Sequence, residues 1–300
     1  MRPLVVLAIV AMGLGCAAER PTPGGAPAGA ADPGRGRRSS PGLRHEAYVW
    51  QRAWTGAVRE AVRGAPAELA GLRVQLLEVD RRGQLGRPGV DAAALAAARR
   101  PVTAVVRIDG ARLPAGVSLA PALDAIAAWR RAGVLVVGLE IDHDCATAAL
   151  PAYAAWLAAA RPPGLRFSAT ALPTWAGAPG LGQVAAAVDE LVVQLHAVRA
   201  PALFEPAAAR RGLERFAAAV PGARLRVALP TYAARVAGAE LAADPDEVAD
   251  LLRSLERAPV PGVTGVVWFR LPVAGDHAAW PSPVLAAVIR GPRPAALEAP

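Results

Sequence analysis

From residue 45 onward, short apolar runs alternate with Ala-, Leu- and Arg-rich stretches that have helical spacing. The apolar runs predict eight strands, at residues 45–50, 72–79, 102–109, 134–142, 165–170, 190–198, 224–230 and 263–270. The stretches between them predict eight helices, at residues 52–63, 91–100, 119–132, 147–161, 182–188, 206–220, 244–257 and 282–290. Helix-stopping segments, such as Arg-Ala-Gly at residues 131–133, precede several of the strands.

Eight strands, each followed by a helix, predict an α/β fold of the (β/α)8 TIM-barrel class. The strands are apolar on both faces, as expected of a parallel sheet that closes on itself and is covered by helices. A doubly wound open sheet is the main alternative, but no glycine-rich turn opens a helix after the first strand. Residues 80–90, in the second unit, have the weakest helical pattern.

The first 44 residues have a different character. Residues 1–16 contain Arg2, an apolar run from Leu4 and small residues before Cys16, which predicts a secretory signal and not a membrane span. This segment resembles a bacterial lipoprotein signal, which implies lipidation of Cys16; ordinary secretion and an uncleaved anchor are the alternatives. Residues 17–44 are rich in Pro, Gly, Ala and Arg and predict a flexible linker.

The predicted domains are therefore a signal at residues 1–16, a linker at 17–44, a single barrel at 45–291 and a tail at 292–300. We expect attachment to a membrane through an N-terminal lipid, in the cell envelope. In a Gram-negative host this would be the outer membrane or its periplasmic side; without the lipid the protein would be secreted. We expect a monomer.

Composition excludes several kinds of chemistry. The chain has no lysine, so all 33 of its basic residues are arginines, and this excludes Schiff-base aldolases, pyridoxal-phosphate enzymes and phosphate-binding loops of the GxxxxGK type. The net charge is +8, but the arginines are scattered along the chain, so we expect no nucleic-acid binding. Four histidines without an HxH or HExxH pair predict no metal site, and we expect no cofactor. Cys145 has no partner cysteine in a mature protein.

Three carboxylates alternate at the end of the fourth predicted strand. Glu140, Asp142 and Asp144 occupy every second position, so they share the inward face of a barrel strand and rise toward its carboxyl end, where barrel active sites form. Burial and mutual repulsion would raise at least one pKa and prepare a general acid. Alternatively, Glu140 and Asp142 pair with inward arginines such as Arg107. We regard all three carboxylates as catalytic candidates.

The same alternation predicts a rim of aromatic, acidic, amide and arginine side chains at the other strand ends. Such a rim is typical of a sugar-binding cleft, because aromatic faces contact the apolar side of a pyranose and polar groups bind its hydroxyls. The candidate binding residues are Trp50, Gln51, Arg52, Asp80, Arg107, Asp109, Thr170, Trp175, Gln194, His196, Tyr232, Trp268 and Arg270. The same alternation places Glu78 and Pro230 on the rim.

The segment GLEIDHD, residues 138–144, resembles the fourth-strand signature of family-eighteen chitinases, a run of the form G-x-D-x-D-W-E. The resemblance places Glu140 and Asp142 on its two Asp positions and Asp144 on its catalytic Glu, while His143 replaces the Trp. VALPTYAAR, residues 227–235, is similar to that family's seventh strand. Trp268 falls where the eighth strand has the Trp that floors the sugar site, and Gln194 and His196 fall on its sixth-strand pair.

Residues 45–290 more closely resemble a bacterial lipoprotein family of unknown function with a glycoside-hydrolase-like barrel. The shared features are AYVWQRAW, GLEIDHD with a following PAYAAWL, FSATALPTW, DELVVQLHAV and PTY. This resemblance implies the fold and a cleft that takes a polysaccharide or oligosaccharide.

Three functions remain open. In a substrate-assisted hydrolase, as the chitinase resemblance implies, Asp144 is the acid, Asp142 its partner, and Tyr232 or His196 contacts the acetamido group. In a two-carboxylate hydrolase, Asp144 faces Asp80 or Asp109. A non-catalytic glycan-binding lipoprotein is favoured by Asp in place of Glu at position 144. A raised pKa of Asp144 with an open cleft favours catalysis, whereas an ion-paired Asp144 or a filled cleft favours binding.

Overall fold

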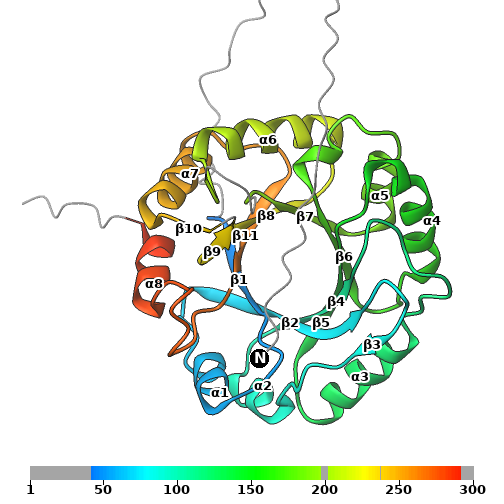
Figure 1. Ribbon diagram of the computed structural model, residues 1–300, viewed down its shortest axis with the longest axis horizontal. Helices are drawn as coiled ribbons and strands as arrows, with labels where there is room; N and C mark the ends of the chain where they lie inside the picture. Colours follow the sequence, from blue (N-terminus) through cyan, green and yellow to red (C-terminus); the bar gives the residue numbers. More distant parts are fainter. Residues whose placement is uncertain (1–41, 197–201, 237, 292–300) are drawn as a thin grey trace, which may run out of the picture. The chain divides into compact units, whose positions relative to one another are not determined.

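Eight parallel strands close into a barrel in the computed structural model, which describes residues 42–196, 202–236 and 238–291 (Figure 1). The strands are β1 (Arg44–Val49), β2 (Leu69–Val79), β4 (Val102–Ile108), β5 (Val136–His143), β6 (Arg166–Ala171), β7 (Glu190–Gln194), β8 (Leu225–Pro230) and β11 (Val263–Phe269). Each pairs with the next, and β1 pairs with both β2 and β11, which closes the ring. The predicted TIM barrel and its eight strands are confirmed.

Eight helices form the outer ring (Figure 1). They are α1 (Gly56–Arg63), α2 (Ala92–Ala98), α3 (Ala120–Arg131), α4 (Leu150–Ala160), α5 (Leu181–Ala187), α6 (Pro206–Ala219), α7 (Pro245–Arg257) and α8 (Ser282–Arg290). In α7, for example, Asp244 caps the helix by accepting from the backbone N–H of Asp246, and Val248, Leu252 and Leu255 bury one apolar stripe. Two short 3-10 turns lie in the loops after β5 and β6: η1 (Thr147–Ala149) directly precedes α4, and η2 (Pro173–Trp175) closely follows β6.

Three short strands were not predicted. β3 (Leu85–Gly86) pairs antiparallel with the end of β2, and β9 (Ala233–Val236) forms a hairpin with β10 (Ala239–Ala242). Both additions follow the carboxyl ends of barrel strands, so they belong to the loops that surround the predicted site. Their alanine, glycine and arginine residues form no apolar run, which is why the sequence pattern gave no strand there.

The barrel interior is part apolar and part ionic. Its apolar cluster consists of Tyr48, Val105, Val192, Ala228 and Val267. Below this cluster, toward the amino-terminal ends of the strands, lies a buried ion network of two arginines and three glutamates, namely Arg73, Arg226, Glu46, Glu140 and Glu190. A much larger apolar layer separates the strands from the helices. The interior below the strand ends is therefore filled by side chains, and any site must lie above it.

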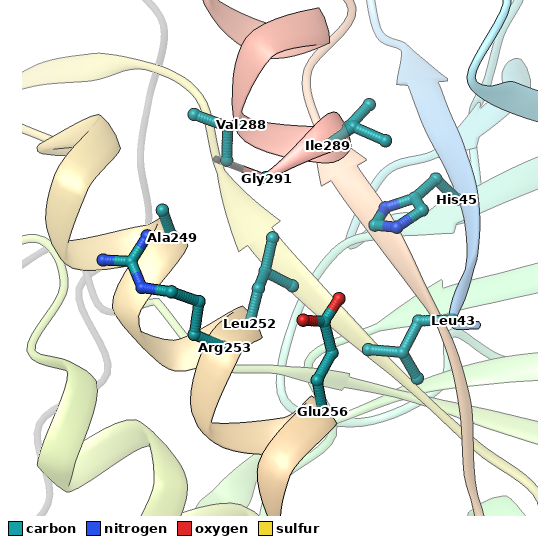
Figure 2. Close-up of a pocket in the computed structure, with 9 residues that line it drawn as sticks. All are labelled: Leu43, His45, Ala249, Leu252, Arg253, Glu256, Val288, Ile289 and Gly291. Atoms are coloured by element: carbon teal, nitrogen blue, oxygen red, sulfur yellow. The ribbon is translucent and has the colours of Figure 1, made fainter. Parts of the chain in front are cut away.

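Both ends of the described chain meet at the amino-terminal side of the barrel. Leu43, which precedes β1, and Gly291, which follows α8, line the same small cavity of about 20 Å³ together with His45 (Figure 2). The signal, Cys16, most of the linker and the tail of the predicted domains lie outside the described residues. Within the described part, no helix is long and apolar enough to cross a membrane.

Candidate active site

Asp142 and Asp144 meet at the carboxyl end of β5, and a single arginine joins them. Arg107, at the end of the neighbouring β4, is paired in register with Asp142. Its Nη1 donates to Asp142 Oδ2 at 2.9 Å and its Nη2 donates to Asp144 Oδ2 at 2.8 Å. Its Nε lies 3.2 Å from Asp109 Oδ1. The expected pairing of Asp142 with Arg107 is therefore present, and it extends to Asp144.

Asp142 is held on both carboxylate oxygens. Its Oδ1 accepts from Thr170 Oγ1 at 2.9 Å and from Gln194 Nε2 at 3.3 Å, while its Oδ2 accepts from Arg107. The three donors come from β6, β7 and β4, so three strands of the barrel fix the orientation of this buried carboxylate. This arrangement suits an ionised group that only accepts hydrogen bonds.

Asp144 has a different environment. Its Oδ2 accepts from Arg107, but its Oδ1 is buried without a hydrogen-bond partner among the described residues. The side chain is 19% exposed. Burial, followed by the charge of Asp142, raises the pKa of Asp144 above its usual range, although Arg107 opposes the change. Asp144 thus combines the ion pair that favours binding with the raised pKa, which favours catalysis where it occurs together with an open cleft.

Four aromatic rings stand on the other side of the barrel mouth. This aromatic wall consists of Trp50, His196, Tyr232 and Phe269. Phe269 contacts each of the other three, with ring centroids 5.4–5.8 Å apart. Tyr232 Oη lies 3.3 Å from His196 Nδ1, and burial lowers the pKa of His196 to about 4, so the imidazole is neutral near pH 7. Trp50, His196 and Phe269 remain partly exposed, as a contact surface for a ligand requires.

Phe269 was missed from the sequence, and Trp268 was predicted in its place. The prediction for Trp268 is wrong: it pairs with Ala47 on the helix-facing side, stacks on His45 at 5.8 Å and is 0% exposed. Gly265 faces the barrel interior, because a side chain there would collide with the buried Arg226 guanidinium. The inward residues of β11 are therefore Gly265, Val267 and Phe269, two residues apart. Counting outward from that glycine would have placed Phe269 in the site.

Two further candidates do not reach the site. Trp175 is buried, with Nε1 donating to the Cys145 carbonyl oxygen at 3.0 Å and its ring against Tyr153, so it packs in the layer between strands and helices. Asp80 lies in the turn after β2, where its Oδ1 accepts from the backbone N–H groups of Arg82 and Gln84, each at 2.8 Å. The strand ends at Val79, so the inward alternation does not continue to Asp80. Both predictions are wrong.

The remaining rim candidates pair with one another or with neighbouring loops. Arg52 binds Glu78 Oε1 at 2.7 Å, and Gln51 Oε1 accepts from the backbone N–H of Trp50. Arg270 is paired with Asp276 in the loop after β11 and is thereby held away from the two aspartates, which have no contact with it among the described ion pairs. Pro230 is paired in register with Phe269 and shares its inward side.

Glu140 lies one layer deeper than the two aspartates. It is 0% exposed, accepts from Tyr48 Oη at 2.6 Å, and is paired with Arg73 and not with Arg107. Burial raises the pKa of Glu140 despite the attraction of Arg73. Because side chains cover it completely, it has no access to a substrate, and its expected catalytic role is corrected to that of a buried support for β5.

His143 faces outward against α4, as alternation on β5 requires. Its Nδ1 lies 3.0 Å from the Ile108 carbonyl oxygen at the end of β4, and its ring meets that of Tyr153 edge-on. Because Ile108 follows Arg107, this contact joins the two strand ends that carry the ion pair. No three His, Cys, Asp or Glu side chains gather as a metal site within residues 42–196, 202–236 and 238–291.

Two pockets of the structure lie away from the aspartates. One is the small cavity beside His45 in Figure 2. The other is a groove of about 270 Å³ at the β9–β10 hairpin, lined by Arg235, Glu240, His277 and three alanines. Neither is lined by Asp142 or Asp144, and the open cleft expected from the sequence stays a prediction.

Comparison with solved structures identifies similar barrels in carbohydrate-related proteins. The spore cortex-lytic enzyme SleL of Bacillus cereus has 13% identity and a TM-score of 0.55, over 84% of this chain and 75% of that chain. A chitinase of Chromobacterium violaceum has 14% identity and a TM-score of 0.53, over 83% and 98%. The GH18 chitinase ChiB of Flavobacterium johnsoniae has 11% identity and a TM-score of 0.52, over 83% and 94%. At these identities the likeness shows a shared fold.

The sequence comparisons are narrower. No curated protein matches the chain. The model of one family, described as a domain of unknown function (DUF3142), matches residues 98–274, which run from the end of α2 through β11 and include Arg107, Asp142, Asp144 and the inward Phe269. Since this match covers more than half of the chain, the protein belongs to the DUF3142 family.

Proposed function

We propose that this protein is a glycoside hydrolase-like protein that acts on a polysaccharide, with Asp144 as general acid and Asp142 as its partner carboxylate. The observation that carries the proposal is the unequal environment of the two aspartates. Asp142 accepts donors on both oxygens, whereas Asp144 has one buried oxygen without a partner and a raised pKa. Two neighbouring carboxyl groups in unequal environments are what general acid catalysis at a glycosidic bond needs.

The proposed reaction is substrate-assisted. The carbonyl oxygen of a 2-acetamido group attacks the anomeric carbon, the bond to the leaving oxygen breaks, and Asp144 Oδ1 gives its proton to that oxygen. Asp142 accepts from the acetamido N–H and stabilises its developing positive charge. Water then attacks the anomeric carbon and returns a proton to Asp144, which restores the acetamido sugar and the enzyme.

The aromatic wall supports the binding half of the proposal. Trp50 and Phe269 offer apolar ring surface, and Tyr232 offers a hydroxyl beside the neutral His196. The similar folds of the chitinases and of SleL agree with a carbohydrate ligand. Asp144 is one methylene shorter than glutamate, so the sugar has to approach β5 by about 1 Å more than in a site with glutamate.

A second function, glycan binding without catalysis, is favoured by the ion pair between Arg107 and Asp144. A guanidinium at 2.8 Å stabilises the ionised carboxylate and opposes proton donation. In this function the aromatic wall and Arg107 bind a sugar, and Asp144 only orients Arg107.

We also propose that the protein acts as a monomer in the cell envelope, anchored through lipidated Cys16. The support is the pattern of residues 1–16, with an apolar run and small residues before the cysteine. Metabolic labelling with a radioactive fatty acid tests the anchor, and a Cys16→Ser variant that still incorporates the label would exclude it.

Product release, measured by mass spectrometry, tests the catalytic proposal. The full chain is incubated with chitin oligosaccharides, peptidoglycan and neutral glucans, next to Asp144→Asn and the matched control Asp124→Asn, which changes an exposed aspartate on α3. Cleavage that is lost in Asp144→Asn and retained in Asp124→Asn supports the proposed acid. Cleavage that survives in Asp144→Asn excludes this assignment, and glycan binding without cleavage by the native chain favours the binding function.

A further inference from the structure

Four exposed arginines gather on two loops at the carboxyl end of the barrel. Arg81, Arg82 and Arg87 lie in residues 80–91, after β2, and Arg112 lies in residues 109–119, after β4; together we call them the arginine patch. None of the four forms an ion pair within the described chain, unlike Arg107 in the neighbouring site. Their charges are therefore free to meet a ligand.

The two loops form one continuous surface. A side chain at Gly110 would meet Arg81 Cγ at 3.3 Å, so Arg81 lies along the loop that carries Arg112. At Gly83 it would meet Pro114 Cβ at 3.7 Å, which brings the loops together at a second point. Arg81 and Arg112 thus share one surface, and Arg82 follows Arg81 in the same loop.

This surface adjoins the candidate site. The loop after β4 begins with Asp109, which is paired with Arg107, and its Ala111 carbonyl oxygen accepts from the backbone N–H of Ala146 at 2.9 Å. Ala146 follows Asp144 by two residues. A polymer bound across the aspartates would therefore extend over the arginine patch on this side.

The arginine patch meets little opposing negative charge from its neighbours. The nearby carboxylates already have partners: Glu78 binds Arg52, Asp109 binds Arg107, and Asp80 accepts from backbone amides. Two strands from β4, the loop after β6, residues 172–180, contains no charged side chain. The surface next to β2 and β4 therefore has a net positive charge.

We propose that the arginine patch binds acidic groups, carboxylate or phosphate, of a polysaccharide that lies across the candidate site. Guanidinium groups bind both kinds of anion in a bidentate manner and stay charged at every physiological pH. The inference rests on the proposed carbohydrate-binding function and specifies its substrate class as an anionic glycan. The aspartates act on one sugar, and the patch binds the acidic groups of sugars further along the chain.

The test compares charged and uncharged forms of the same polymer. Binding of the full chain is measured by affinity electrophoresis in gels that contain polygalacturonate, its methyl-esterified form, a phosphomannan or unmodified mannan. The patch variants are Arg81→Ser/Arg82→Ser and, should the first fold poorly, Arg87→Ser/Arg112→Ser. The matched control is Arg63→Ser/Arg131→Ser, which removes the same charge from exposed arginines in the last turns of α1 and α3.

We expect the native chain to prefer the acidic polymers, and the preference to weaken as salt is raised. Each patch variant should bind them about tenfold more weakly, since two exposed charge contacts are lost, while the control keeps native affinity. Polygalacturonate and phosphomannan together show which anion binds more tightly.

Equal retention by acidic and neutral polymers, or equal losses in the patch and control variants, would overturn the inference. Tighter binding to single-stranded DNA than to either acidic glycan would also overturn it, in favour of a nucleic-acid surface. Failure of the catalytic proposal gives a different result: no glycan is cleaved, while the charge preference and its loss in the patch variants remain.

Discussion

Replacing Arg107 by methionine removes the guanidinium that joins Asp142 to Asp144 while it keeps a side chain of similar length. In the native site this group donates to the two carboxylates at 2.9 and 2.8 Å. Without it, Asp142 keeps Thr170 and Gln194 on Oδ1, but Asp144 loses the one side-chain hydrogen bond that the described residues give it. The pKa of Asp144, already raised by burial and by Asp142, should therefore rise further.

The size of this change follows from the contact. An arginine at hydrogen-bond distance lowers the pKa of an aspartate by about 1–3 units, which corresponds to about 1.4–4 kcal/mol between the two protonation states. Loss of Arg107 should raise the pKa of Asp144 by this amount. Because a carboxyl with a raised folded-state pKa stabilises the fold only while protonated, Arg107→Met should lose stability as pH rises through that pKa. At low pH it should approach the native stability.

Carbon-13 NMR of labelled aspartate side chains measures this pKa directly, with the Asp144 resonance assigned by its absence in Asp144→Asn. Arg270→Met, which breaks the separate pair with Asp276, is the control and should leave the Asp144 titration unchanged. A titration of Asp144 in Arg107→Met that matches the native protein within a few tenths of a unit would refute the ion pair as a determinant of this acid. If hydrolysis is found, the pH limb assigned to the acid should move upward with the NMR value.

Four other substitutions test the fold and the site. Arg73→Met should lower the free energy of unfolding by about 3–5 kcal/mol in urea, because it leaves three buried glutamates with one arginine; an unchanged midpoint would contradict this network. Trp268→Ala should cost about 3–5 kcal/mol of stability without weakening glycan binding, whereas Phe269→Ala should weaken binding; the reverse pattern would return Trp268 to the site. His143→Phe should cost about 0.5–1.5 kcal/mol through the lost contact with Ile108. Burial lowers the pKa of His143, so the native protein loses stability when the pH falls below the usual pKa of histidine. The cost of His143→Phe should therefore be smaller at such a pH than near pH 7, as urea titrations at the two pH values would show.

The barrel was predictable because each strand is a short apolar run bounded by helix stops and polar loops. Helix boundaries differ from the prediction by a few residues at most; α1 begins at Gly56 and not at residue 52, because residues 50–55 form a loop at the barrel mouth. The β9–β10 hairpin was missed because its alternation is between alanine and charged residues, which is too weakly apolar to indicate a strand.

The site was partly predictable, since alternation along β5 correctly placed Asp142 inward and His143 outward. Alternation failed on β11, where it placed Trp268 inward; counting from the inward Gly265 places Phe269 there instead. On β2, an irregularity between Gln75 and Leu77 interrupts the strict two-residue alternation, and Glu78 faces inward. The partner of Asp144 was not predictable, because the distance between β4 and β5 side chains appears only once the register is known.

The shared cavity of Leu43 and Gly291 means that the barrel is nearly a closed loop of chain as well as a closed sheet. A short peptide joining the two ends would complete it, and new ends opened in another loop would give a circular permutant with the same ring of strands. The same arrangement decides how the protein is best immobilised. A tag or surface attached at either end holds the barrel by its amino-terminal side and leaves the aspartates, the aromatic wall and the arginine patch facing the solution.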